Sequence, residues 1–176
     1  MNLKKLLISF PTAVFFYLTA SAAHAQSFSM SDETATIGSS SVEVSWSWTA
    51  GSSVSGFGID IVFDDGLLTP KTTSVSGAET VDGCLVNVPA GYLQACNLID
   101  ASTIRVTLTN LAGDIASLDP GGSITFDISS DAVVGDTSNF ALTLASVVPA
   151  NTTVTLDNGA ENEVEIVAVP LGPAGE

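Results

Sequence analysis

The chain has very little positive charge and a single histidine. Its 176 residues hold 4 Lys and Arg against 19 Asp and Glu, and the histidine is His24. After residue 25 only Lys71 and Arg105 remain as cations, no histidine follows, and all the acids lie in this part. Ser-His-Asp and Cys-His catalytic arrangements and His-ligated zinc sites are therefore excluded there. Nucleic acid and anionic lipid are excluded as partners, because surfaces that bind them are built from Lys and Arg.

Long apolar runs are also scarce, and the one that stands out lies near the N-terminus. Two lysines precede a mostly apolar stretch over residues 6–18, and the small-x-small sequence Ala23-His24-Ala25 follows it. These features predict a secretory signal peptide over residues 1–25, cleaved between Ala25 and Gln26. The alternative, an uncleaved anchor, needs about 20 apolar residues. The run here is shorter, and Pro11 interrupts it.

Cysteine is limited to Cys84 and Cys96. Because a secreted chain meets an oxidising compartment, we predict that the two form a structural disulfide. In the chain-entropy model, closing a loop of this size stabilises a fold by about 3 kcal/mol. A redox-active pair is the alternative, but such pairs usually have closer spacing and lie at a helix N-terminus.

The chain after residue 25 has the length of one domain and the sequence pattern of β-strands. Apolar side chains alternate with polar ones in several short stretches, and Gly, Pro, Asp and Asn lie between these stretches. The clearest stretches are residues 41–48, 56–63, 104–108, 124–128 and 140–144. We predict one domain over residues 26–168 and a Pro/Gly-rich tail over residues 169–176, which cannot continue a strand.

This pattern predicts an all-β fold, an antiparallel two-sheet sandwich of about eight or nine strands, with a barrel as the alternative. No apolar period of 3.6 residues is long enough for a surface helix. The large side chains expected between the sheets are Trp46, Trp48, Phe57, Phe63, Phe126 and Phe140.

Four local features are also predicted. We expect a first strand within residues 28–37, an irregular segment over residues 84–97, and a turn at Asp119-Pro120-Gly121-Gly122. We further expect a terminal hairpin that joins residues 152–156 to residues 164–168.

Carboxylates are the only catalytic groups that could act here. A glycosidase needs two of them about 5 to 10 Å apart, and the candidates are Asp60, Asp64, Asp65 and Asp127. They occupy outward strand positions or turns, where acids are normally solvated rather than held in the apolar pocket that raises a carboxyl pKa. We therefore predict that the protein is not an enzyme and has no catalytic residue.

Two acidic turns could offer oxygen ligands to Ca²⁺, namely Asp64-Asp65, and Asp157-Asn158 together with Glu161. Neither matches the twelve-residue loop in which Ca²⁺ ligands alternate with spacers. Turn formation explains both clusters, so we predict no metal site and no cofactor, and Ca²⁺ stays the alternative.

Trp46 and Trp48 lie two residues apart, so they share one face of their strand. If that face were outward, the two rings could stack on sugars. Val42 and Val44 share the same face, however, which favours packing in the core.

Four stretches, residues 59–68, 104–108, 121–128 and 140–144, resemble the cohesin family. In that family an apolar strand ends in an aromatic-Asp corner followed by Leu, as in Phe63-Asp64 and Leu67, and a Gly-led strand with an aromatic residue comes later. The likeness covers roughly residues 42–166. It implies a nine-stranded jelly-roll sandwich, related to some carbohydrate-binding modules, that binds a dockerin module when polysaccharide-degrading complexes assemble or at the cell surface.

Some family members carry polar recognition side chains at positions that fall here on Gly56 and Gly58. Glycine offers no such side chain, so no recognition residue is carried over and the binding residues stay unassigned.

The preferred hypothesis is a secreted, non-catalytic, cohesin-like module that binds a protein partner of the dockerin type or a polysaccharide-associated assembly. One alternative is a carbohydrate-binding module, suggested by Trp46, Trp48 and Tyr92. Another is a structural subunit of a cell surface or extracellular matrix, suggested by the lack of site chemistry and the Ser/Thr/Gly-rich outward positions. The expected location is extracellular or on a bacterial cell surface.

The predicted cleavage can be checked on the protein recovered from the culture medium. Its N-terminal residue should be Gln26, because signal peptidases accept small residues before the cut. Ala25→Leu should slow cleavage and retain the precursor. A secreted protein that still carries Lys4 and Lys5 would contradict the prediction, and peptide mass mapping distinguishes the two forms.

Overall fold

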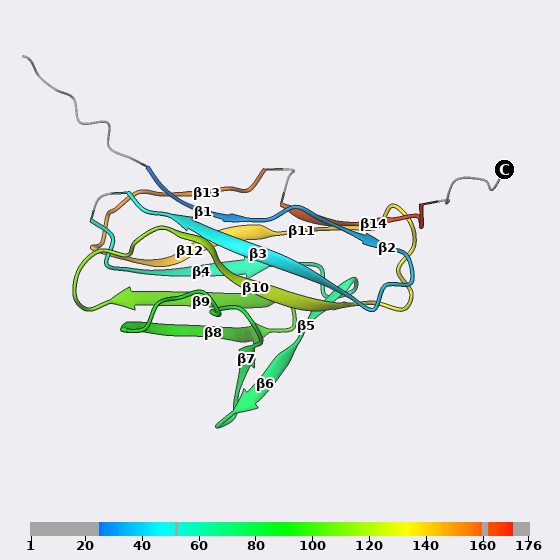
Figure 1. Cartoon of the computed structure of the whole chain (residues 1–176), viewed down its shortest axis with the longest axis horizontal. Helices are drawn as coiled ribbons and strands as arrows, with labels where there is room; N and C mark the ends of the chain where they lie inside the picture. Colours follow the sequence, from blue (N-terminus) through cyan, green and yellow to red (C-terminus); the bar gives the residue numbers. More distant parts are fainter. Residues whose placement is uncertain (1–24, 52, 160–161, 171–176) are drawn as a thin grey trace, which may run out of the picture.

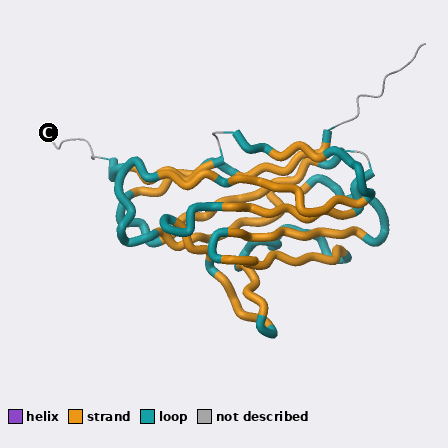
Figure 2. Tube along the Cα trace, turned by 180° about the vertical axis from the view of Figure 1, so that it is seen from behind, coloured by secondary structure: helices purple, strands orange, loops and turns teal. Residues whose placement is uncertain are grey.

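The computed structural model describes residues 25–51, 53–159 and 162–170. Every regular element in these ranges is a strand (Figures 1 and 2). The strands are β1 (Gln26–Met30), β2 (Glu33–Thr36), β3 (Ser41–Thr49), β4 (Gly56–Val62), β5 (Leu68–Pro70), β6 (Thr72–Val75), β7 (Ala78–Val81), β8 (Tyr92–Asp100), β9 (Thr103–Asn110), β10 (Leu118–Ile128), β11 (Thr137–Asn139), β12 (Ala141–Val148), β13 (Val154–Leu156) and β14 (Glu163–Val167). In the described part of the chain we find no helix of the length and hydropathy that a membrane span needs.

The strands form three sheets. A five-stranded sheet has the order β13-β1-β3-β10-β5, and a six-stranded sheet has the order β12-β4-β9-β8-β7-β6. A three-stranded sheet has the order β11-β14-β2. In the sequence, β2 follows β1 and β14 follows β13 of the five-stranded sheet, whereas β11 precedes β12 of the six-stranded sheet. Aromatic rings of the five-stranded sheet pack on Phe57 of the six-stranded sheet, so the two larger sheets are the layers of a sandwich. The predicted all-β sandwich is thereby confirmed.

The alternating positions form the core as predicted. Trp46 and Trp48 on β3 are 0% and 1% exposed, and Ile59 and Ile61 on β4 are both 0% exposed. Phe57, Phe63, Phe126 and Phe140 are buried as well. Burying one such side chain contributes about 1.5–3 kcal/mol relative to leaving it in water. The two sheets therefore pack against each other, because alternation with a period of two residues places the large side chains of each strand on one face.

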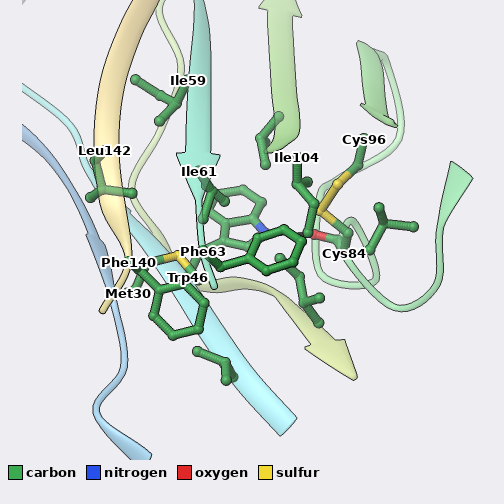
Figure 3. Close-up of a cluster of buried hydrophobic side chains, with 14 of the residues drawn as sticks. Met30, Trp46, Ile59, Ile61, Phe63, Cys84, Cys96, Ile104, Phe140 and Leu142 are labelled. Carbon is green, nitrogen blue, oxygen red and sulfur yellow. Dashed lines mark hydrogen bonds between the residues drawn. A yellow bond between two sulfur atoms is a disulfide. The ribbon is translucent and has the colours of Figure 1, made fainter. Parts of the chain in front are cut away.

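A segment between β7 and β8 ties the two layers together. Cys84 forms the predicted disulfide with Cys96 on β8, with an S–S distance of 2.02 Å. The indole Nε1 of Trp46, on the opposite sheet, donates a hydrogen bond of 2.6 Å to the carbonyl oxygen of Cys84 (Figure 3). A Cβ built on Gly122 would lie 1.7 Å from the same carbonyl oxygen. Only glycine therefore lets this segment come so close to β10.

The strand count and the pairing differ from the expectation in detail. The described residues form fourteen strands, several of them only three or four residues long. The pairs β1–β13 and β2–β14 are parallel, whereas the other pairs are antiparallel.

The single first strand was a wrong prediction. The chain forms β1 and β2, which belong to different sheets. Between them, the hydroxyl of Ser31 donates to the Glu33 carboxylate and accepts from the backbone N–H of Ser45. These bonds hold the bend at which the chain leaves one sheet for the other.

Two other local predictions are also wrong, and a third holds only in part. The expected turn at residues 119–122 is a register shift inside β10, where the glycines make room for the Trp46 ring. The segment expected to be irregular over residues 84–97 is irregular only over residues 84–91, because β8 begins at Tyr92 and pairs along β9. The terminal hairpin does not form, because β13 pairs with β1 while β14 pairs with β11 and β2. The partners of β13 and β14 lie far away in the sequence, so local turn signals could not reveal them.

The link from Trp46 to Cys84 can be tested by comparing two tryptophan variants. Trp46→Phe leaves the buried Cys84 carbonyl without its donor, which costs about 1–3 kcal/mol. Trp48 is the matched control, because its Nε1 is buried without a hydrogen-bond partner. We expect Trp46→Phe to lower the free energy of unfolding by at least about 1 kcal/mol more than Trp48→Phe, measured by denaturant titration. Equal losses in the two variants would show that the bond contributes nothing.

Candidate functional site

The outward side of the six-stranded sheet is the candidate functional surface. Because neighbouring side chains of a strand point to opposite sides, the buried positions identify which residues face out. We use the name outer face for the outward residues of β12, β4, β9 and β8. They are Ala141, Thr143, Ser146 and Val148; Gly56, Gly58, Asp60 and Val62; Thr103, Arg105, Thr107 and Thr109; and Leu93, Ala95, Asn97 and Ile99.

A single ion pair occupies the middle of the outer face. Arg105 Nε donates to Asp60 Oδ1 at 2.6 Å, and Arg105 Nη2 donates to Asp60 Oδ2 at 2.7 Å. The hydrogen bonds and the negative charge of Asp60 raise the pKa of Arg105 above its ordinary value. Both charges of the outer face are thereby paired with each other, and the guanidinium plane is held in one orientation.

The ion pair belongs to a polar row that crosses the whole sheet. The strand register aligns Thr143, Asp60, Arg105, Asn97, Thr80 and Thr73, one residue from each of β12, β4, β9, β8, β7 and β6. A bound partner could therefore find hydrogen-bond donors and acceptors along one continuous line.

The two glycines of β4 keep the outer face smooth. A Cβ on Gly58 would lie 2.7 Å from Ser146 Oγ, and one on Gly56 would lie 3.1 Å from Thr109 Oγ1. Side chains of β12 and β9 thus lie over the β4 backbone, in space that a side chain on β4 would fill. The sequence shows the glycines, but only the strand pairing shows what covers them.

Apolar side chains lie toward both ends of the outer face. Val148 and Leu93, in the same register row, are 50% and 58% exposed. Toward the other end, Val62 and Ile99 are 37% and 50% exposed. The face therefore has a polar centre and apolar margins.

The turn between β8 and β9 has a defined charge state. The Asp100 carboxylate accepts a hydrogen bond of 3.0 Å from the backbone N–H of Ser102. This bond lowers the pKa of Asp100, so the turn keeps its negative charge.

The opposite layer presents a different surface. The outward residues of β1, β3 and β10 include a set of hydroxyl side chains, Ser27, Ser29, Ser45, Ser47, Ser123 and Thr125. An ion pair joins Lys71 Nζ to Asp127 Oδ1 at 3.3 Å. Both cations of the described residues are thus paired, one on each layer.

The structure does not assemble the carboxylates considered for catalysis. Asp60 lies in the six-stranded sheet and Asp127 in the five-stranded sheet, and each is paired with a cation. Asp64 Oδ1 accepts the backbone N–H of Gly66 at 2.9 Å, which closes the turn after β4. Asp65 is an exposed residue of the same turn.

The acidic turns considered for Ca²⁺ serve the backbone. Asp157 Oδ1 accepts the N–H of Gly159 at 3.1 Å, as Asp64 does for Gly66. Glu161 lies outside the described residues. Within the described ranges no three His, Cys, Asp or Glu side chains gather as a metal site would require.

The two tryptophans considered for sugar stacking are not available for it. Trp46 and Trp48 are buried, which confirms core packing and rules out the stacking platform. The hydroxyl of Tyr92 accepts the backbone N–H of Ala116 at 3.3 Å, and this ring packs at the edge of the core.

No family model matches the chain, and no curated protein sequence does. Solved structures with a similar fold are cohesin modules. The seventh ScaB type I cohesin of Pseudobacteroides cellulosolvens is 14% identical with a TM-score of 0.59, and the match covers 86% of this chain and 99% of that one. A type I cohesin–dockerin complex from Clostridium thermocellum matches at 14% identity and a TM-score of 0.58, covering 82% and 95%.

A type III cohesin from the ScaE cell-surface anchoring scaffoldin of Ruminococcus flavefaciens is 13% identical with a TM-score of 0.56, and the match covers 87% of this chain and 94% of that one. Identities this low establish the fold alone. The chain has the fold of a cohesin module.

Proposed function

We propose that the chain is a secreted, non-catalytic module that binds a protein partner of the dockerin type through the outer face. The observation that carries the proposal is a nearly uncharged sheet surface on a cohesin fold whose sequence is otherwise strongly acidic. One of the similar structures is itself a cohesin–dockerin complex.

The composition of the outer face suits protein recognition. Interface centres are depleted in charged residues, because charges are costly to remove from water. Here the two central charges, Asp60 and Arg105, already neutralise each other. The nearest other acid in the register, Asp100, lies at the end of the sheet opposite Thr103. The apolar margins, Val148 with Leu93 and Val62 with Ile99, would bury surface as a partner covers the sheet.

Arg105 is the residue best placed to dominate the binding energy. Arginine is enriched among the few interface residues that carry most of the affinity. Its Nε and Nη2 bond to Asp60, which leaves the Nη1 hydrogens for an acceptor on a partner. Because Asp60 holds the guanidinium in place, little side-chain entropy is lost on binding.

The charge of the whole chain restricts the choice of partner. With 19 acidic residues against two cations after residue 25, the surface repels anionic proteins. We therefore expect a partner that is neutral over the contact and basic around it. Such a partner associates faster at low salt than at high salt.

The proposed location rests on three features. The N-terminal segment has the pattern of a signal peptide, and the only two cysteines form a disulfide, a bond typical of secreted proteins. One similar structure comes from a cell-surface anchoring scaffoldin.

The proposal is tested by blocking the outer face. The mature chain is used as bait against the secretome of its host and against a panel of dockerin modules. Thr107→Arg places a long charged side chain next to Gly58 in the middle of the face, and we expect it to abolish specific capture. Thr125→Arg on the opposite layer is the matched control and should bind like the parent chain. The proposal would be rejected if both variants reduced capture equally. It would also be rejected if none of the captured proteins carried a dockerin module.

The role of Arg105 gives a second, quantitative test. Arg105→Gln removes the central donor, and we expect the partner's affinity to fall at least about tenfold. Lys71→Gln removes the cation of the other ion pair and should leave the affinity unchanged. Isothermal titration measures both variants, and thermal unfolding confirms that each is folded. Equal affinities for the two variants would place the binding site elsewhere.

A further inference from the structure

The six-stranded sheet has two edges, and they differ in how their backbone groups are used. Near the start of β12, the edge is occupied by groups of the segment after β13. Asn158 Oδ1 accepts the N–H of Leu142 at 2.6 Å, while Asn158 Nδ2 donates to the carbonyl of Leu142 at 3.1 Å. The N–H of Phe140 donates to the carbonyl of Asn162 at 2.8 Å. Asn158 thus bonds to Leu142 of β12 as a residue of a neighbouring strand would, and the Phe140 bond lies just before β12.

The other edge is β6, and no described strand pairs with its outer side. β6 and β7 form a hairpin that projects from the sandwich (Figures 1 and 2). Its tip is Ser76-Gly77, with φ angles of 52° and 85°. Positive φ at both central residues is typical of the two-residue turn that joins hairpin strands.

The hairpin register shows which backbone groups face outward. Val75 pairs with Ala78 across the two-residue turn, so these two residues exchange hydrogen bonds. Bonded and non-bonded pairs alternate in an antiparallel ladder. The N–H of Asp82 donates to the carbonyl of Lys71 at 2.9 Å, in agreement with this alternation. The N–H and C=O groups of Thr72 and Ser74 therefore point away from β7, toward the open edge.

Side-chain bonds hold this edge in the strand conformation. Thr72 Oγ1 donates to Glu79 Oε2, and Thr73 Oγ1 donates to Asp82 Oδ1, both at 2.8 Å. Val75 at the end of β6 is 55% exposed. A partner strand would thus meet a preformed backbone edge with an apolar side chain beside it.

Exposed edges are normally protected by lysine, proline, a bulge or a covering segment. β6 reads Thr-Thr-Ser-Val and has none of these within it. We propose that the free edge of β6 is a second interaction site, which takes an extended, cationic peptide segment as an added β-strand. Main-chain bonds to Thr72 and Ser74 would supply most of the affinity in this mode of recognition.

Charge on the hairpin selects this occupant. Glu79 is its charged residue, Asp82 follows directly after β7, and the nearby Lys71 ammonium is paired with Asp127. A lysine- or arginine-bearing segment complements these acids. A second copy of this chain would instead bring two acidic hairpins together. The site does not use the outer face, so it does not depend on the proposed function.

The test uses the mature chain labelled with ¹⁵N and a synthetic peptide in which Thr and Val alternate between two terminal lysines. The ends of the peptide are acetylated and amidated. We expect chemical-shift changes and slower amide exchange at Thr72 and Ser74. The affinity should fall roughly threefold or more between about 50 and 500 mM NaCl, because salt screens the exposed charges.

Two variants separate edge pairing from other modes of binding. Ser74→Pro removes the outward N–H, which the hairpin itself does not use, and proline is tolerated at such edge positions. We expect it to weaken peptide binding at least tenfold. Ser74→Ala keeps the N–H and should bind like the parent chain. Near-ultraviolet circular dichroism checks that both variants keep the sandwich.

Several results would overturn the proposal. The peptide could bind Ser74→Pro and Ser74→Ala equally, or cause its shifts along β12 or the outer face. A peptide with N-methyl groups on alternate residues could bind as well as the unmodified one. If amide exchange at Thr72 and Ser74 became slower with rising protein concentration and without peptide, the occupant would be a second copy of the chain. No shift at millimolar peptide would reject the site.

Discussion

The packing of β3 and β1 against β4 is the constraint on which the other features depend. The rings of Trp48 and Phe57 stack with centroids 4.5 Å apart, and Phe28 contacts both Trp46 and Phe57 at 5.4 and 6.1 Å. Because strand side chains alternate, these inward rings decide which residues of β4 face out. A slip of one residue would turn Phe57 to the solvent and Asp60 to the core. The outer face exists in its observed form because this register is strongly preferred.

The segment that carries Cys84 extends the same constraint to the rest of the core. Its carbonyl is bonded to Trp46 in one layer, and its sulfur is bonded to Cys96 in the other. The segment, whose Leu85 and Val88 also pack against the core, thereby becomes part of the link between the sheets. The close approach needs Gly122, which explains why a glycine pair interrupts the regular pairing of β10.

The surfaces show how an acidic protein can still present places for contact. On the outer face, the bidentate pair of Asp60 and Arg105 removes the net charge from the centre of the sheet. At the sheet edges, Asn158 occupies the backbone groups of Leu142, whereas the edge of β6 remains open. The outer face and the β6 edge thus differ in chemistry, one offering side chains over an area and the other offering main-chain groups along a line.

The sequence alone determined the all-β class, the inward side of β3 and β4, and the disulfide. These follow from period-two alternation, which is local, and from having only two cysteines in a chain with a secretory signal pattern. Tertiary structure decided the pairing of Asp60 with Arg105, the covering of Gly58 by Ser146, the parallel pairing of β13 with β1, the bonding of Asn158 to β12 and the open edge of β6. Each of these joins residues far apart in the chain, or depends on which strands become neighbours. Strand order and register are set by the packing of the whole core, and no local pattern contains them.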